Sequence, residues 1–510
     1  MMADQAHSPD GVLAGNRRWF AASIALLFAA LAVATALTKR PFFDEAFFAA
    51  PGLDLVTRGS MGNPIVEPLG FSSSPGIPAL RVNTSAYFAP PLSFLTQAAW
   101  YKIVGFGVLR MRLLSTLWGL AALAAWFVIA LRITGSETAA LGAAFLIGCD
   151  HFFLDSGTSG RPDMMSAALG AMAIAAYLAL RESGLGRAVL VSQLFLAAAF
   201  FTHPIGGIAI FAITLFAIAY DRKRLQLRHC LIAALPYLAL GAMWAWYISL
   251  DVPAFRAQMA GNTGGRAAGL AAPLESLARE VAWRFLDRSY YPSYAAGFRK
   301  ITVLIPVIFA VSVVWLLLDR PAAKTTAGRL LAALAICYFF VFGIFDTSKA
   351  NFYLVHTTPL LACCAAVWAH AQWRRGSARH WLSLGAVGLL VFLQLAWNIY
   401  GITRDSYHKV YEPAVRYLSA HAAPQDLIFA TGEFGFGLGF YRNVRDDSTL
   451  GYFTGKRASY IVFEESGYGQ SFKGFADRNP GLERYVRNSL AADYEKVYAN
   501  EEYEIFHRYR

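Results

Sequence analysis

The sequence predicts a polytopic α-helical membrane protein with a small α/β domain at its C-terminal end. The 510 residues are 56% hydrophobic and only 15% charged, and the mean hydropathy is +0.42. Apolar runs of about 20 residues, the length that a helix needs to cross a bilayer, recur as far as residue 400. Beyond Gly401 charges become frequent, and short alternating segments replace the apolar runs.

About eleven of the apolar runs are expected to be membrane-spanning helices. The first lacks a small-residue cleavage site, so we expect it to be an uncleaved helix and not a signal peptide. The predicted spans are 19–38, 109–131, 138–153, 164–180, 188–202, 204–220, 230–249, 301–318, 330–345, 352–371 and 381–400.

Basic residues orient these spans. Lys and Arg gather in alternate connections, most densely in "DRKRLQLRH" from Asp221 to His229. Such connections mark the cytoplasmic side, which places the N-terminus in the cytoplasm and the segment after the eleventh span outside. The net charge of +12 is explained in the same way, so no nucleic-acid partner is expected.

The opposite side is expected to carry the outer loops of a transmembrane module that covers residues 1–400. These loops are 39–107, 150–163 and 251–300, with a shorter one at 346–351. The first contains "PPLSFLTQAAWYKIVG" (Pro90 to Gly105), which is apolar but short for a span, so we predict an interfacial helix there, in contact with membrane lipid.

Residues 401–510 are predicted to form the outer α/β domain, which is large enough to fold alone. No GxGxxG or P-loop occurs, so no nucleotide site is expected. The domain should contain a helix at Tyr411–Ala422, buried strands at Asp426–Ala430 and Ala458–Phe463, and a hairpin at Tyr494–Tyr509.

Acidic residues stand at the ends of spans in two of the outer loops. "RPFFDEAFF" holds Asp44 and Glu45, and "DHFFLDSGTSGRPDMM" holds His151, Arg161 and Asp163. Carboxylates beside a membrane are costly and often functional, and hard divalent cations such as Mg²⁺, Mn²⁺ or Ca²⁺ prefer their oxygen atoms. We therefore expect the two loops to meet in one hydrated cavity. The alternative is that the acids cap helices, which stabilises a helix by about 1 kcal/mol.

Basic and hydroxyl groups in the outer loops are candidates for binding a lipid-linked phosphate. Lys349 and Tyr353 are four residues apart and would share one helix face. Arg58 and Arg288 are further candidates, although interfacial arginines often serve only as anchors. Two histidines are additional site candidates. His203 lies at a predicted helix break, where a structural role is the alternative, and His356 follows Tyr353.

Several of these segments together resemble the GT-C glycosyltransferases, in particular the bacterial branch related to protein O-mannosyltransferases and to the lipid A aminoarabinose transferase. The segments cover roughly the first 370 residues and are similar in order and spacing. They are "FFDEA", "YFAPPLSFLTQAAWYKIVGFGVLRMRLLSTLWGL", "SGRPDMMSAALGAMAIAA", "FFTHPIGGIAIF" and "SKANFYLVHTTPLLA".

The resemblance implies a sugar transferase in a bacterial inner membrane, with a polyprenyl-phosphate sugar as donor. The acceptor, a lipid, a glycan or a protein, would be used on the outer face. Asp44 would be the catalytic base or part of a metal site with Glu45 as its neighbour, and Asp163 would be a metal ligand. Lys349 and Tyr353 would approach the donor phosphate.

One departure from the family concerns the first loop. The aminoarabinose transferases have an acidic and a basic residue just before the Pro-Pro of this loop, where this chain has Phe88 and Ala89. The departure removes a metal ligand and a phosphate-binding cation, and it argues against aminoarabinose transfer to lipid A.

The predicted reaction is a single inverting displacement in which a carboxylate takes the proton of the acceptor hydroxyl. A transporter or flippase for lipid-linked sugars is the main alternative, but it would place more charged residues inside the spans. A non-catalytic membrane scaffold would make the two acidic loops incidental. Among enzymes, an oligosaccharide ligase or polymerase is the nearest alternative.

Overall fold

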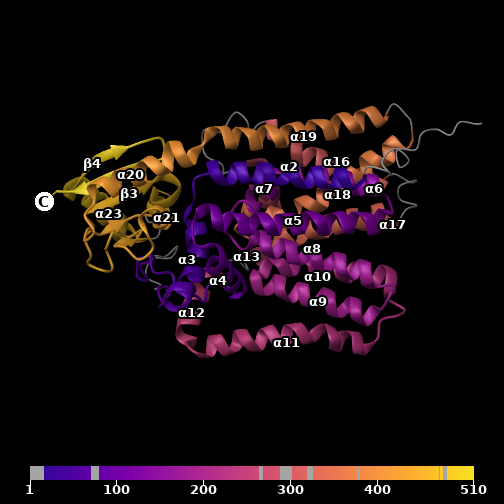
Figure 1. Ribbon diagram of the computed structural model, residues 1–510, viewed down its shortest axis with the longest axis horizontal. Coiled ribbons are helices and arrows are strands. Elements are labelled where there is room, and N and C mark those ends of the chain that lie inside the picture. The colour runs from indigo at the N-terminus through magenta and orange to yellow at the C-terminus, as the bar shows by residue number, and fades with distance from the viewer. Residues whose placement is uncertain are drawn as a thin grey trace, which may run out of the picture.

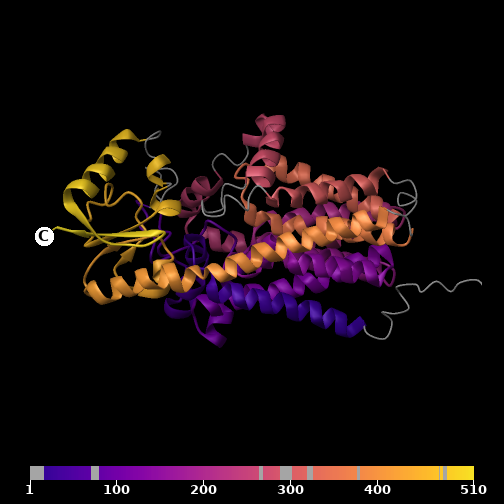
Figure 2. The ribbon, with the colours of Figure 1, turned by 90° about the horizontal axis from the view of Figure 1, so that it is seen from above.

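The computed structural model describes residues 17–70, 80–263, 268–287, 301–318, 326–375, 379–469, 471–474 and 479–509. Long helices lie side by side along the longest axis of the molecule, and a small domain with a sheet stands at one end of them (Figures 1 and 2). The predicted architecture of a helical membrane part followed by an α/β domain is therefore confirmed.

The helices of the membrane part follow the apolar runs, because a helix satisfies its own backbone hydrogen bonds where water is absent. All of the predicted spans coincide with helical segments. These are α2 (Arg17–Thr38), α5 (Val108–Thr134), α6 (Glu137–Cys149), α7 (His151–Gly157), α8 (Asp163–Leu180), α9 (Leu185–Thr202), α10 (Ala209–Phe216), α11 (Leu227–Ser249), α16 (Leu304–Leu318), α17 (Thr326–Phe345), α18 (Thr358–Trp373) and α19 (Arg379–Arg404).

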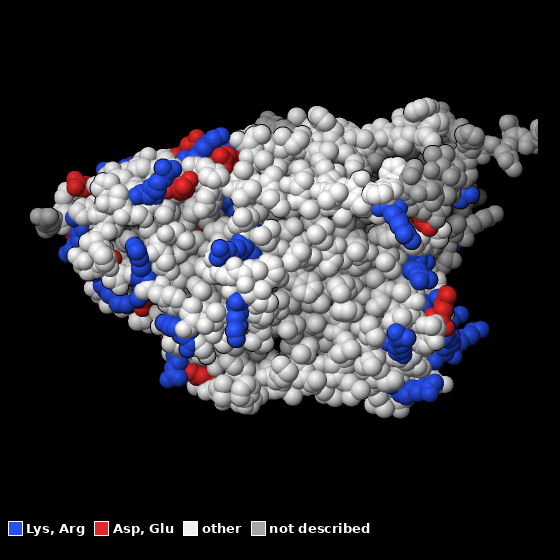
Figure 3. All heavy atoms as spheres, in the orientation of Figure 1, with Lys and Arg blue, Asp and Glu red and all other residues white. Residues whose placement is uncertain are grey.

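Fewer of these helices are long and apolar enough to cross a membrane alone. Within the described residues 8 helices meet that test, or up to 9 if a bent pair counts as one span. The short helix α16 and the helix α18 are not among the 8. The chain is thus a multi-pass membrane protein. Figure 3 shows a broad middle region almost free of charged side chains, with basic side chains at the end of the bundle opposite the sheet.

The bent pair is α6 and α7, whose axes differ by 65°. Asp150 separates the two helices in an extended conformation, and its side chain accepts a hydrogen bond from the Phe153 amide at 2.9 Å. Helix α19 fixes the bend: the Gln394 amide donates to Asp150 Oδ2 at 2.6 Å, and Asn398 Nδ2 donates to the carbonyl of Cys149 at 2.9 Å. The single span predicted at 138–153 is therefore two helices.

The outer connections contain short helices of their own. The first holds α3 (Phe43–Arg58) and α4 (Leu92–Val104), which confirms the helix predicted in "PPLSFLTQAAWYKIVG". The connection after α11 holds α12 (Val252–Thr263), α13 (Ala268–Ala271), α14 (Pro273–Arg279) and a wider turn, η3 (Glu280–Asp287). Two 3-10 turns, η1 (Pro204–Ile208) and η6 (Asn351–His356), and a π-turn, η2 (Ala217–Asp221), complete this part.

The C-terminal segment has the elements that the sequence predicts. Its sheet has the order β2-β1-β3-β5-β4, with β1 parallel to both β2 and β3, and β5 antiparallel to both β3 and β4. The predicted hairpin is the pair β4 and β5. The strands are β1 (Ile428–Phe429), β2 (Val444–Arg445), β3 (Tyr460–Glu464), β4 (Tyr494–Ala499) and β5 (Tyr503–Arg508); the helices are η7 (Tyr407–Tyr411), α20 (Glu412–His421), α21 (Phe434–Leu438), η8 (Glu465–Gly469) and α23 (Pro480–Asp493).

The C-terminal domain and the first outer connection share one hydrophobic core. Ala46, Phe48 and Phe94 belong to the same buried cluster as Phe434 and Ile505. An isolated parallel bridge between Val66 and Asp446 also joins the two parts. The sheet is therefore packed against the start of α3, the helix that carries the first pair of predicted site residues.

Candidate active site

The site is built where the start of α3 meets the loop between α7 and α8. Phe42 has an extended backbone and precedes α3. The carboxylate of Glu45 accepts a hydrogen bond from the backbone amide of Phe42 at 3.3 Å, and the first turn of α3 therefore contains Asp44 and Glu45. Acids are favourable there because the N-terminal end of a helix is electropositive. Asp163 stands in the first turn of α8 in the same way, after Pro162.

Arg161 joins the two acidic positions. Its Nε donates to Asp163 Oδ2 at 2.7 Å, and its Nη1 donates to Asp44 Oδ2. Its guanidinium lies 3.7 Å from the ring centre of Phe352 and 5.2 Å from that of Phe48. The structure therefore brings Asp44, Arg161 and Asp163 together, as expected if the two loops form one site.

The three side chains differ in their access to solvent. Asp44 is 17% exposed, whereas Arg161 and Asp163 are 5% and 2% exposed. Asp163 Oδ1 is buried and has no hydrogen-bond partner among the described residues. Asp44 is therefore the carboxylate of this group that an incoming molecule reaches most easily.

Glu45 lies on the other side of the helix start, fully buried against Arg112 of α5. Arg112 donates to both of its carboxylate oxygens, at 3.0 and 2.6 Å, and Gly160 donates its amide to Oε1 at 3.0 Å. Both oxygens are thus held by the protein. The sequence leaves open which of Asp44 and Glu45 would be the base and which a ligand or orienter, and the contacts of Glu45 suit an orienting role.

The sequence pattern does not identify Arg112, because this residue lies in an apolar run that predicts a membrane-spanning helix. It is fully buried and also donates to the backbone carbonyls of Ala36, Lys39 and Arg40, at 2.9, 2.6 and 3.1 Å. A charge at the edge of an apolar helix was the signal that could have identified it. Its hydrogen bonds fix the turn between α2 and α3.

The loop that carries Arg161 is held equally firmly. Ser115 and Thr116 of α5 donate to the carbonyls of Ser159 and Gly157, at 2.5 and 2.9 Å, and Gln97 of α4 donates to the carbonyl of Gly160 at 3.0 Å. These bonds satisfy carbonyls that would otherwise be buried without partners. The guanidinium is consequently presented by a fixed backbone.

Lys349 lies in a separate group of buried charges. It has a left-handed backbone (φ 52°), and its ammonium donates to the Gly343 carbonyl at 2.6 Å and lies 3.1 Å from Glu280 Oε2. Arg284 pairs with Glu280 at 2.6 Å and also with Asp346. Burial lowers the pKa of Lys349 and raises that of Glu280.

The expectation that Lys349 and Tyr353 share a helix face is wrong. Tyr353 lies in the 3-10 turn η6, whereas the left-handed backbone of Lys349 comes before that turn. The ring of Tyr353 lies 5.5 Å from that of His203, a site candidate at the break between α9 and η1. The structure thus brings Tyr353 to His203 and places Lys349 with Glu280.

Of the remaining arginine candidates, Arg58 does not join the site. Arg58 is exposed near the far end of α3, where it pairs with Asp54 at 2.5 Å. Arg288 lies outside the described residues. His151 is fixed at the bend after α6: its Nε2 accepts from the Trp397 indole at 2.7 Å, and its Nδ1 lies 2.9 Å from Asn398 Oδ1.

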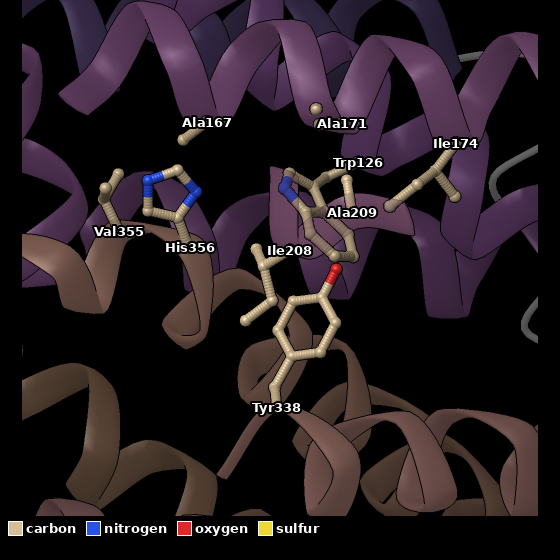
Figure 4. Close-up of a pocket in the computed structure, with 10 residues that line it drawn as sticks. Trp126, Ala167, Ala171, Ile174, Ile208, Ala209, Tyr338, Val355 and His356 are labelled. Carbon is tan, nitrogen blue, oxygen red and sulfur yellow. The ribbon is translucent and has the colours of Figure 1, made fainter. Parts of the chain in front are cut away.

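His356 lines a small cavity inside the helix bundle, with Trp126 and Tyr338 among its neighbours (Figure 4). The cavity leaves a volume of about 10 Å³ for the centre of a water molecule. It can therefore hold one water molecule and is too small for a sugar. His356 is buried and lies near Asp163.

The residue pair that departs from the aminoarabinose transferases is part of the core. Phe88 lies against the rings of Phe47, Phe48 and Phe94, with centroids 4.2, 5.8 and 5.6 Å away. Ala89 is 5% exposed. An acidic and a basic side chain would be out of place among these rings.

Asp44 and Asp163 are the two carboxylates at this site that could bind the predicted divalent metal. One oxygen of each already accepts a hydrogen bond from Arg161. The described residues contain no group of three or more His, Cys, Asp and Glu side chains placed to hold a metal ion. The residues therefore fit a guanidinium between the carboxylates better than a metal ion.

The family described as dolichyl-phosphate-mannose-protein mannosyltransferase matches residues 89–247. No curated protein matches the chain in sequence. The solved structures that resemble it include ArnT from Cupriavidus metallidurans bound to undecaprenyl phosphate, with a TM-score of 0.56 and 14% identity over 98% of each chain.

A second similar structure is the archaeal oligosaccharyltransferase AglB from Archaeoglobus fulgidus in complex with an inhibitory peptide and a dolichol-phosphate. It has a TM-score of 0.55 and 11% identity over 97% of this chain and 75% of the other. The Archaeoglobus fulgidus oligosaccharyltransferase in complex with Zn and sulfate has a TM-score of 0.56 and 12% identity, over 96% of this chain and 73% of the other. At these identities the likeness shows a shared fold.

Proposed function

We propose that this chain, which has the GT-C fold, is a membrane glycosyltransferase that uses a polyprenyl-phosphate sugar as its donor. The sugar goes to an acceptor lipid, glycan or protein on the outer side of a bacterial inner membrane, with inversion at the anomeric carbon. The N-terminus is cytoplasmic in this proposal, and the C-terminal domain lies outside with the site.

One observation carries the proposal: Asp44 and Asp163, far apart in the sequence, meet through Arg161. If the two acids served only to cap their helices, they would not need to share a cation. Two carboxylates around one guanidinium, one of them partly exposed, form a preorganised polar site.

Asp44 acts as the general base in the proposed reaction. It takes the proton of the acceptor hydroxyl as the oxygen of that hydroxyl forms its bond to the anomeric carbon. The bond from the anomeric carbon to the phosphate oxygen breaks, and polyprenyl phosphate leaves with the electron pair. The donor is already activated, so no nucleotide is needed.

The other acids have supporting roles. Glu45 and Arg112 hold the start of α3, which orients the Asp44 carboxylate. Asp163 holds the guanidinium through Nε, whereas Asp44 contacts Nη1. Fixed groups of this kind save the cost of arranging them during the reaction.

Lys349 remains the candidate ligand for the donor phosphate. In the described state it is neutralised by Glu280, and Arg284 is neutralised by Glu280 and Asp346. A phosphate that reaches this group would have to replace a carboxylate as the partner of the cations, and charge-assisted bonds to phosphate are strong enough for such an exchange. Tyr353 and Arg58 are less suited to contact the same phosphate as Lys349, given where they lie.

The test is sugar transfer by the purified protein in detergent, with a panel of synthetic polyprenyl-phosphate sugars. We expect transfer or donor hydrolysis, and we expect Asp44→Asn to lower the rate by about 10²- to 10⁴-fold, the usual contribution of a general base. The inversion predicts that a β-linked donor gives an α-linked product.

Asp54→Asn is a matched control, because Asp54 lies on the same helix and pairs with Arg58 away from Arg161. It should leave the rate within about threefold of the wild type. No turnover of any donor would refute the proposal. Movement of intact donor across proteoliposomes in that case would favour a transporter.

A further inference from the structure

The cation between Asp44 and Asp163 belongs to the protein itself. Arg161 contacts one oxygen of each carboxylate, and Phe352 and Phe48 lie against its guanidinium. The planar donors of a guanidinium match carboxylate oxygens, so the bridge has a defined geometry.

The guanidinium occupies the position from which a metal ion would touch Asp44 Oδ2 and Asp163 Oδ2 together. A cation that enters between Asp44 Oδ2 and Asp163 Oδ2 must displace Nη1 and Nε of Arg161. The guanidinium is 5% exposed and is held by the two acids and the two rings, so leaving would break every one of these contacts.

We infer that Arg161 takes the place of a divalent metal, so that the transferase proposed above works without a bound metal ion. The inference rests on the proposed function only for its activity readout. The charge of Arg161 balances one of the two carboxylates, and it leaves Asp44 Oδ1 outside the ion pair, where it can accept a proton.

The inference has a consequence that a purely structural arginine would not have. Removal of the guanidinium leaves two carboxylates facing one space, with the buried Asp163 Oδ1 as an additional acceptor. Like charges so close repel each other and attract cations. Arg161→Ala should therefore create a cation site that the wild-type protein lacks.

The following measurements on the full-length protein in detergent test this. Metal analysis of the wild type should find well below one equivalent of divalent metal, and chelators should change its activity by less than about twofold. Arg161→Ala should lose roughly 10²-fold in rate, as expected for removal of one preorganised charge, and Arg161→Lys should lose less.

Addition of Mg²⁺, Mn²⁺ or millimolar guanidinium should restore Arg161→Ala by about 10-fold, with no gain for the wild type. The same ions should raise the thermal midpoint of Arg161→Ala. They should not raise that of the wild type or of the double variant Arg161→Ala, Asp163→Asn. Arg110→Ala, a change of an exposed arginine on α5, is the control for loss of a basic residue near the site.

A stoichiometric metal in the wild type, or activity that chelators abolish and metal restores, would overturn the inference. So would an Arg161→Ala protein whose stability does not respond to any of the cations. If Arg161→Ala does not fold, the metal content of the wild type and the response of Arg161→Lys to cations decide. If no donor is turned over, the proposed function fails, and the metal content and thermal shifts still test the inference.

Discussion

At the residue scale, a fully buried ion pair determines where Asp44, the proposed base, lies. Glu45 and Arg112 are both fully buried, and Arg112 also binds three carbonyls of the turn between α2 and α3. Removal of one partner of such a pair leaves an uncompensated buried charge, which costs about 3–5 kcal/mol. The pair thus holds Asp44 in place at a distance from the chemistry.

We therefore predict that Glu45→Gln lowers the stability of the protein by roughly 3 kcal/mol. The thermal midpoint in detergent measures this. Asp44→Asn serves as the comparison, since it should lose activity with little loss of stability. A double variant, Glu45→Leu with Arg112→Met, should recover part of the loss, because the buried charge is removed with its partner. Equal stability of Glu45→Gln and the wild type would show that the pair is not a structural one.

At the scale of elements, the sequence predicts the helices and strands better than their interruptions. Apolar length determines helical structure in a membrane, so every predicted span falls on helical segments, although the span at 138–153 is divided between α6 and α7. The alternation of residues locates β3 and the final hairpin. The bend at Asp150 was missed because the amides that stabilise it, Gln394 and Asn398, come from α19, more than 240 residues later.

The same limit explains the candidate site. The spacing at the ends of helices identified Asp44 and Asp163, but no local pattern shows that Arg161 bridges them. The four-residue spacing between Lys349 and Tyr353 predicts one helix that carries both residues. This spacing does not indicate the left-handed backbone of Lys349. Partners that come from distant segments are decided by packing, which a single sequence does not display.

A buried carboxyl group between β1 and α21, that of Glu433, should make the stability of this domain depend on pH. Burial and the nearby charge of Glu464 raise the pKa of Glu433 to about 7, from an ordinary value of 4.5. Thr431, at 2.6 Å, and the charge of Arg40 oppose the shift. The buried Asp446 nearby also has a raised pKa, and the hydroxyl of Tyr503 faces Glu433 at 3.5 Å.

A raised pKa means that the folded state binds the proton more tightly than the unfolded state. The stabilisation is complete below about pH 4.5 and is lost as the pH rises through about 7, by about 3 kcal/mol at most. We predict a thermal midpoint of the domain that falls between about pH 5 and pH 8. Glu433→Gln should weaken this fall by the contribution of one proton, and an unchanged slope would show that Glu433 is not the responsible group.

At the scale of the whole molecule, Arg40 connects the membrane part to the C-terminal domain, four residues before Asp44. Its Nη2 lies 2.7 Å from Glu464 Oε1, its Nη1 donates to the Tyr503 hydroxyl at 3.0 Å, and its Nε pairs with Glu502. Its backbone amide donates to Ser406 Oγ at 3.0 Å. Strands β3 and β5 are thereby tied to the segment that leads into the candidate active site.

We predict that Arg40→Ala loosens both ends of this connection. Glu464 and Glu502 lose their shared cation, so amide hydrogen exchange in β3 and β5 should become faster, and the start of α3 should follow because the segment before it is no longer held. The rate of transfer should fall roughly 10-fold, since a displaced base reacts poorly even when it is chemically intact. Lys39→Ala is the matched control: its pair with Asp155 is more exposed and should contribute about 0.5 kcal/mol. Faster exchange that stops at the sheet, with α3 and the rate unchanged, would show that the domain is attached to the catalytic segment without helping to position it.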